Sequence, residues 1–305
     1  MPAGRQAYPS AARKRANEVI DELGITGVPI IPESIAAKRN LRVETSASFP
    51  PTAFGALVKN GNQFTIVVSA HCPSDGHRRF TLAHELGHFF LNDHFAALFE
   101  NSTIHVSNEA NFRGRKQWFE VEADAFASEL LVPTRYARGI VEGLDVGVDG
   151  IRTLGGAFQT SLSCAAIRFA ALTHEPMAAI LSYKGTVEWI AFSGSLEVHE
   201  WVRRRWKGEW APPRSATARL ASSTEEITRG AQLSDSGMLS EWFLGAPNSD
   251  VTEEAMGLGR YGRVLTVLWC PDLPSPDEQL EQEEAARRPP TDWRDSMRTY
   301  RFDDY

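Results

Sequence analysis

Residues 84–88 read His-Glu-Leu-Gly-His and have the composition and spacing of a site for metal-assisted peptide hydrolysis. On a helix, His84 and His88 lie on one face and can bind the same ion. Glu85 is offset by one position, where it can act as general base on a water molecule. The surrounding run 80–91 is apolar, so the alternative is a helix with two core histidines. That alternative buries polar groups without partners, at a cost of about 1–3 kcal/mol each, and the pattern therefore favours a metal site.

A second acidic segment offers the further ligand that such a site needs. A catalytic zinc ion usually has three protein ligands and one open position. Apolar residues recur at helical spacing over 118–132, and Pro133 ends that helix. Glu120 and Asp124 share a face, so we expect Glu120 to ligate the ion and Asp124 to hold a ligand histidine through its other ring nitrogen. Glu122 lies about 160° from Asp124 around the helix and is a weaker candidate. The alternative is a solvated acidic face.

Two segments together resemble the ImmA/IrrE family of metallopeptidases. They are residues 79–88, Arg-Phe-Thr-Leu-Ala-His-Glu-Leu-Gly-His, and residues 120–133, which run from Glu-Val-Glu-Ala-Asp to Leu-Leu-Val-Pro. The segments 54–57 and 64–68 resemble the hairpin that precedes the zinc helix in that family. The resemblance extends over roughly residues 8–172, about half of the chain.

The resemblance implies a zinc-dependent endopeptidase with a Zn²⁺ cofactor. By that resemblance His84, His88 and Glu120 are the zinc ligands and Glu85 is the general base. The sequence departs from the family at Asp124, where asparagine is common, while the proposed ligands match.

The resemblance also implies the kind of partner. Family members are known or proposed to cleave small repressors of the helix-turn-helix (XRE) type, which relieves repression in stress-response, mobile-element or toxin–antitoxin settings. We therefore expect a repressor protein as substrate. Two alternatives stay open: a metal-containing antitoxin or binding protein without proteolysis, and a DNA-binding regulator with a relic peptidase fold.

Composition and charge are those of an ordinary globular protein. The chain has 305 residues, 42% of them hydrophobic and 23% charged, with a net charge of −7. The acidic balance disfavours a general nucleic-acid binder. No apolar run approaches the ~20 residues that span a bilayer, and residues 1–6 lack the apolar core of a signal peptide. The 3 cysteines are few and far apart, which favours reduced thiols in the cytoplasm.

The fold class expected from these patterns is α+β. A helix over 8–24, a short helix after Pro32, a strand over 41–44, and a hairpin of 56–58 with 64–68 predict a zincin-like domain with a small antiparallel sheet. Lys59-Asn60-Gly61-Asn62 is the hairpin turn. An edge of this sheet can bind an extended substrate as an added strand, and the alternative is a purely structural hairpin.

We predict four parts along the chain: 1–146 as the metallopeptidase domain, 147–174 as a helix-turn-helix-like segment, 175–271 as a second α+β domain with a possible sensory role, and 272–305 as a disordered tail. The second part has two helices around residues 159–161, with Ser161 as a cap. Arg168 is its one basic residue on the second helix, which favours packing or repressor docking over DNA contact. Strands are expected over 178–183, 186–192 and 263–269.

Other residues carry weaker indications. Residues 92–117 are expected to wrap the cleft, and His94, His105 or Tyr136 is a candidate to stabilise the oxyanion, the alternative for a loop histidine being solvent exposure. Residues 201–207 interleave basic and aromatic side chains, as in nucleic-acid contacts, although a solvated helix face is favoured. In the tail, Trp293, Tyr300 and Phe302 form a candidate docking motif.

Overall fold

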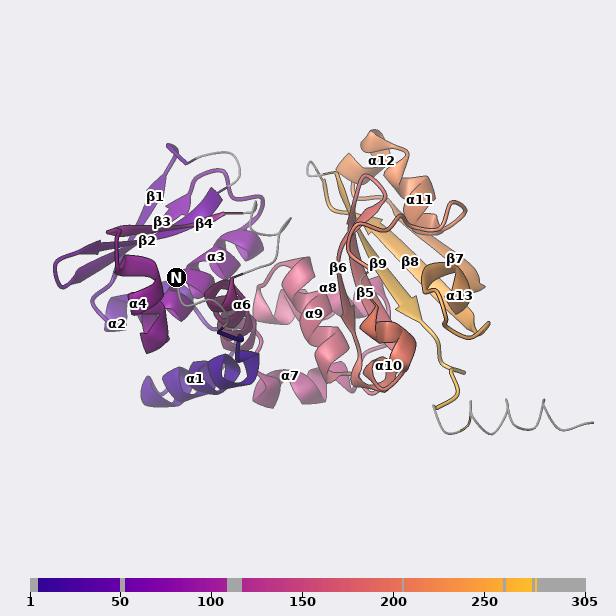
Figure 1. Cartoon of the computed structure of the whole chain (residues 1–305), viewed down its shortest axis with the longest axis horizontal. Coiled ribbons are helices and arrows are strands. Elements are labelled where there is room, and N and C mark those ends of the chain that lie inside the picture. The colour runs from indigo at the N-terminus through magenta and orange to yellow at the C-terminus, as the bar shows by residue number, and fades with distance from the viewer. Residues whose placement is uncertain are drawn as a thin grey trace, which may run out of the picture.

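A computed structural model shows an elongated molecule with a β-sheet near each end and helices between the sheets (Figure 1). The structure describes residues 5–49, 53–108, 117–204, 206–259, 262–275 and 278. The predicted docking residues of the tail lie outside these ranges. Among the described residues, no helix is long and apolar enough to cross a membrane.

The N-terminal part combines helices with a mixed sheet. Its elements in chain order are α1 Pro9–Glu22, α2 Pro32–Lys38, β1 Arg42–Ser46, β2 Ala53–Asn60, β3 Gln63–Ser69, α3 Asp75–Phe90, α4 Asn92–Phe99, β4 Ile104–Asn108, α6 Trp118–Leu131 and α7 Thr134–Val141. The expected hairpin of β2 and β3 is present, and Gly61 in its turn has a φ of 60°. Most sequence-predicted helices and strands of this part are therefore confirmed.

The order of the strands differs from the expectation. The sheet runs β1-β3-β2-β4, and β1 pairs with β3 in parallel. The expectation of a purely antiparallel sheet is therefore wrong. β1 does not pair with β2, the next strand in the sequence, but with β3, the second strand of the hairpin, and this pairing is parallel. The segment 92–117 was expected only to wrap the cleft, but it contains α4 and the edge strand β4, which pairs with β2.

Helix α3 begins at a side-chain cap and runs beneath the sheet against α6. The hydroxyl of Ser74 accepts a hydrogen bond from the His77 amide, which satisfies a free backbone donor of the first turn. Near its other end, a Cβ built on Gly87 would lie 3.2 Å from both the Cα and the carbonyl oxygen of Ala123. The missing side chain at Gly87 thus lets the histidine helix pack closely against the acidic helix.

Two helices follow as expected, α8 Val148–Phe158 and α9 Leu162–Leu172. Between them Gln159 has a φ of 49°, and the Ser161 hydroxyl accepts a hydrogen bond from the Cys164 amide at 3.2 Å, which confirms the predicted cap. Burial raises the pKa of the Cys164 thiol to about 11, consistent with a packing role.

Arg168 of α9 points into the protein. Its side chain is 3% exposed, and its guanidinium donates to the Val132 carbonyl at 3.1 Å and to the Thr134 hydroxyl at 2.9 Å. It also forms an ion pair with Glu129 of α6 at 2.8 Å. The basic side chain that DNA contact would need is therefore used to join α9 to α6 and α7.

The C-terminal part is built on a second sheet. Its elements are β5 Met177–Tyr183, β6 Thr186–Phe192, α10 Gly194–Glu197, a 3₁₀ helix Glu200–Arg203, α11 Ala216–Ala221, α12 Thr224–Thr228, β7 Gln232–Met238, α13 Leu239–Trp242, β8 Asp250–Gly257 and β9 Arg263–Trp269. The strand order is β6-β5-β9-β8-β7, all antiparallel. The three expected strands are confirmed. β7 and β8 were missed because both are rich in polar residues.

The two faces of this sheet pack against different partners. Met177, Ala179 and Leu265 belong to the same core as α8 and α9, and that core continues to α1 and α3. The opposite face carries an aromatic cluster in which Trp201, 7% exposed, stacks on Phe243 with ring centroids 5.3 Å apart. The expectation that residues 201–207 form a solvated helix face is therefore wrong for Trp201, which is a core residue.

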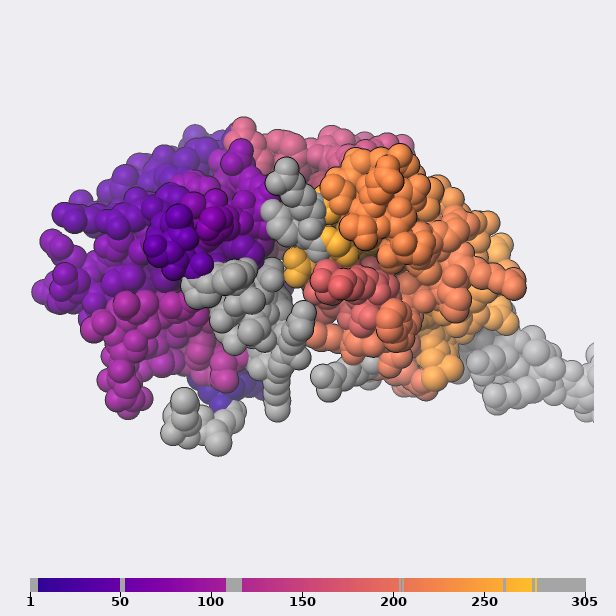
Figure 2. All heavy atoms as spheres, turned by 90° about the horizontal axis from the view of Figure 1, so that it is seen from above, coloured from indigo at the N-terminus to yellow at the C-terminus, as the bar shows by residue number. Residues whose placement is uncertain are grey.

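Figure 2 shows the two ends of the molecule joined along one side by the pink segment that contains α8 and α9. This view agrees with the continuous core described above. The boundaries at residues 146, 174 and 271 stay predictions, as does a cytoplasmic location.

Candidate metal centre

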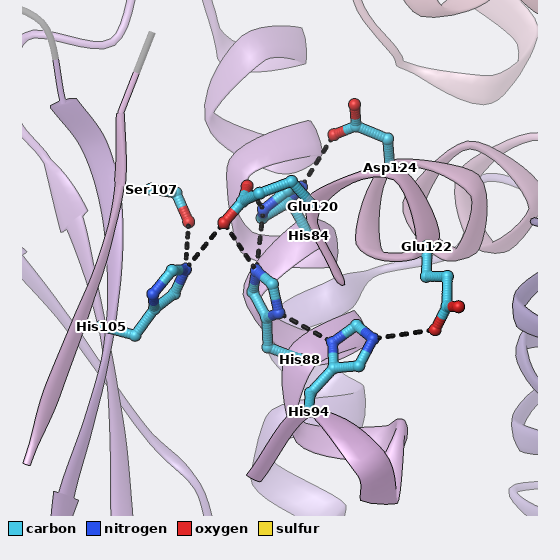
Figure 3. Close-up of polar contacts among 8 residues, drawn as sticks. All are labelled: His84, His88, His94, His105, Ser107, Glu120, Glu122 and Asp124. Carbon is cyan, nitrogen blue, oxygen red and sulfur yellow. Dashed lines mark hydrogen bonds and ion pairs between the residues drawn. The ribbon is translucent and has the colours of Figure 1, made fainter. Parts of the chain in front are cut away.

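Three buried side chains from two helices converge on one point (Figure 3). His84 and His88 lie one turn apart on α3, with their Nε2 atoms 3.1 Å from each other. Glu120 extends from the first turn of α6, and its carboxylate oxygens lie 3.2 Å from Nε2 of His84 and 3.7 Å from Nε2 of His88. The side chains that sequence spacing singled out are therefore brought together by the packing of α3 on α6.

The donor set fits a zinc ion. Zinc binds imidazole nitrogen and carboxylate oxygen at about 2.0–2.2 Å, so neighbouring ligand atoms of a tetrahedral site are about 3.4 Å apart. The two Nε2 atoms are 3.1 Å apart, and the Glu120 carboxylate lies at similar distances, with Oε2 3.2 Å from His84 and Oε1 3.7 Å from His88. Three protein donors also leave one tetrahedral position for water or substrate, as in catalytic sites.

Glu85 lies beside these donors on α3 and is completely buried. Neither of its carboxylate oxygens has a well-formed hydrogen bond with a described residue. Burial raises the pKa of Glu85, and the neighbouring His84 and His105 offset part of that effect. A buried carboxylate with raised basicity is suited to accept a proton.

The outer nitrogen of His84 is held by an acid. Its Nδ1 lies 2.9 Å from a carboxylate oxygen of Asp124, one turn after Glu120 on α6. Burial lowers the pKa of His84, but the carboxylates of Asp124 and Glu120 outweigh burial and raise it to about 10. The contact expected between Asp124 and a ligand histidine is present, and it directs Nε2 towards Glu120.

The outer nitrogen of His88 is held differently. Its Nδ1 lies 2.9 Å from Nδ1 of His94 in the first turn of α4, and Nε2 of His94 lies 3.1 Å from Oε2 of Glu122. His94 is fully buried behind His88, and Glu122 is 5% exposed. His94 therefore contacts a candidate ligand from behind and does not face substrate, while Glu122 lies outside the donor group.

The edge strand β4 supplies a fourth histidine. Nε2 of His105 lies 3.0 Å from Oε1 of Glu120, and its ring centroid is 4.7 Å from that of His88. The hydroxyl oxygen of Ser107, two residues further along β4, lies 3.5 Å from Nε2 of His105 (Figure 3). Of the three oxyanion candidates, only His105 faces the centre, since the Tyr136 hydroxyl donates to the Ile25 carbonyl.

Sequence reasoning did not find the roles of His94, Glu122 and Ser107. Ser107 gives no signal in the sequence. A signal for the other two did exist: a histidine six positions after His88, and a glutamate on α6 that faces away from Asp124. The pairing depends on how α4 folds back against α6, which sequence spacing does not reveal.

Comparison with known proteins places the centre in a family. No curated protein gives a significant match. A solved structure described as a Mycobacterium tuberculosis transcriptional regulator is similar in fold, with a TM-score of 0.52, 16% sequence identity, and coverage of 86% of this chain and 76% of that one. Residues 26–169, which contain the whole candidate metal centre, match the family model Peptidase_M78, described as the IrrE N-terminal-like domain. Residues 26–169, a little under half of the chain, therefore form a domain of the ImmA/IrrE family of metallopeptidases.

Proposed function

We propose that the protein is a zinc-dependent endopeptidase that cuts a regulatory protein. The observation that carries the proposal is the convergence of His84, His88 and Glu120, with Glu85 buried beside them on the same helix. We assign the first three as Zn²⁺ ligands and Glu85 as the general base. The bound ion would supply Lewis acidity towards the scissile carbonyl and the attacking water.

Within this site Glu85 takes a proton from the water and passes it to the leaving amine. Its carboxylate is completely buried, and Ser107 of β4 is a neighbouring hydrogen-bond donor to it. His105 is the residue that we assign to the substrate carbonyl. Its Nε2 points at Glu120, so an N–H on that atom is aimed at the centre where negative charge develops on the carbonyl oxygen.

We propose that the substrate binds as an added strand along β4. β4 is the last strand of its sheet, so one side of its backbone is not paired with a described strand. His105 and Ser107 alternate along β4 with the exposed apolar side chains of Ile104 and Val106. Backbone pairing with β4 would hold an extended peptide beside His105 and the metal centre.

We further propose that the substrate is a helix-turn-helix repressor. The family resemblance supports this class of substrate, and the structurally similar Mycobacterium tuberculosis protein is described as a transcriptional regulator. The net charge of −7 favours a basic partner such as a DNA-binding protein. The alternative of direct DNA binding through α9 loses support, because Arg168 is committed to the interior.

The test is incubation of the zinc-loaded protein with a repressor encoded by a neighbouring gene. We expect a single-site cut that chelator prevents and added zinc restores. The variant Glu85→Gln should bind zinc as the wild type does and cut nothing, whereas His84→Ala should lose both properties. Cleavage by Glu85→Gln would overturn the proposal. A stable complex without cleavage would favour the antitoxin-like alternative.

A further inference from the structure

The side chains behind His88 form an unbroken buried chain. His88 contacts His94 at 2.9 Å through their Nδ1 atoms, and His94 contacts Glu122 at 3.1 Å through Nε2 (Figure 3). His88 and His94 are both 0% exposed. The far end is anchored as well, since Oε1 of Glu122 accepts a hydrogen bond from the Tyr8 amide at 2.9 Å.

Valence determines where the protons of this chain lie. An ionised carboxylate only accepts, so Nε2 of His94 carries the hydrogen that Glu122 receives. Nδ1 of neutral His94 is then an acceptor, and Nδ1 of His88 must donate to it. Nε2 of His88 is consequently left with a lone pair, on the side that faces His84 and Glu120. Each step follows from the one before, and the last leaves His88 in the tautomer that binds a metal ion.

The surroundings of His94 favour this role over simple filling of the core. Its ring lies against Trp118 and Phe119, with centroids 5.2 and 6.3 Å away. An apolar side chain would suit this aromatic environment at lower cost, because burying a carboxylate beside it requires partners for that charge. His94 links the buried carboxylate of Glu122 to the ring of His88, so that the carboxylate can orient His88 through it.

We propose that His94 and Glu122 are a positioning pair that fixes the tautomer and orientation of His88, and thereby raises the affinity of the centre for zinc. His84 has a carboxylate directly behind it, in Asp124, whereas the carboxylate that serves His88 acts through an intervening imidazole. The proposal rests on the metal centre of the proposed function and does not depend on substrate.

The first measurement is zinc affinity, by competition with a chromophoric chelator and without any peptide. Loss of a group that orients a ligand histidine typically costs about 10- to 100-fold in metal affinity. We expect a loss of that size for His94→Phe, which keeps the ring volume, and a smaller loss for Glu122→Gln. His94→Asn should regain part of the affinity, because its amide oxygen can accept from Nδ1 of His88. His199→Phe, a buried histidine of the aromatic cluster on the second sheet, is the matched control and should bind zinc normally.

The second measurement reads the tautomers directly and needs no variant. In the zinc-loaded wild type, long-range ¹H–¹⁵N spectra should show a hydrogen on Nδ1 of His88 and on Nε2 of His94. The opposite tautomer at His94, or zinc affinities of His94→Phe and Glu122→Gln equal to that of the wild type, would overturn the positioning role while leaving the proposed peptidase intact. A wild type that binds no zinc at His84 and His88 would instead refute the proposed function itself.

Discussion

Gly55 of β2 lies directly against the carboxylate of Glu85 on α3. A Cβ built on Gly55 would be 2.5 Å from Oε1 of Glu85 and 2.6 Å from the Thr81 methyl group. Real Cβ atoms do not approach so closely, so the absence of a side chain at Gly55 makes the room in which the proposed base sits. The sheet therefore contributes to the site because Gly55 of β2 has no side chain that would displace Glu85.

Gly55→Ala should displace Glu85 and leave the ligands in place. A displacement of about 1 Å costs on the order of 100-fold in rate, so we expect a fall of that size in kcat with unchanged zinc content. Gly139→Ala in α7 is the control, because nothing lies within 4 Å of its added Cβ. Full peptidase activity in Gly55→Ala would show that Glu85 is not confined as described.

His105→Gln tests the residue assigned to the substrate carbonyl. Removal of one oxyanion donor typically lowers kcat by about 100- to 1000-fold, and we expect that loss with little change in KM. Val106→Ala, on an exposed side chain of the same strand, should have a small effect on kcat. If His105→Gln changed KM alone, His105 would serve in binding only.

Asp124→Ala should weaken zinc binding, because Nδ1 of His84 loses its acceptor at 2.9 Å. The expected loss of affinity is about 10- to 100-fold. Asp124→Asn should lose less, since an amide oxygen can still accept that hydrogen bond. Chelator competition measures both, with Asp149→Ala on the exposed side of α8 as control. Unchanged affinity in Asp124→Ala would contradict an orienting role.

His77 should make the folded state less stable as the pH falls. Burial, with a contribution from the charge of Arg263, lowers the pKa of His77 to about 4, from its ordinary value of 6.5. Between these pH values the unfolded chain binds a proton that the folded protein does not, so stability increases with pH through this window. The full effect is at most about 3 kcal/mol.

The measurement for His77 is the free energy of unfolding from pH 7 to pH 4, compared between the wild type and His77→Gln. As the pH falls, the free energy of unfolding of the wild type should decrease more than that of His77→Gln. The exposed His174→Gln is the matched control, because solvent surrounds that side chain in both states. A difference that does not vary with pH would refute the burial argument.

Arg168→Met should destabilise the protein strongly. It leaves the carboxylate of Glu129, which is 1% exposed, without its cation, and breaking such a buried pair costs about 3–5 kcal/mol. Arg152→Met removes an exposed pair with Asp149 and should cost less than about 1 kcal/mol. Denaturant unfolding compares the two. A small effect of Arg168→Met would mean that α9 does not depend on this ion pair.

Local patterns in the sequence were enough to predict much of the fold and the centre of the site. Two histidines four apart, and an acidic helix that ends just before Pro133, have fixed helical geometry, so His84, His88 and Glu120 could be selected before any contact was known. The hairpin at Gly61 and the cap at Ser161 are likewise determined by neighbouring residues, and both are confirmed.

Tertiary structure decided what depends on distant segments. The parallel pairing of β1 with β3, the approach of β4 with His105, and the return of α4 that joins His94 to Glu122 all connect residues far apart in sequence. Such contacts form because packing must bury apolar faces and pair buried polar groups across the whole molecule, and no local periodicity encodes that choice. The sequence therefore determined which side chains could bind a metal ion, and the fold determined which others hold them in position.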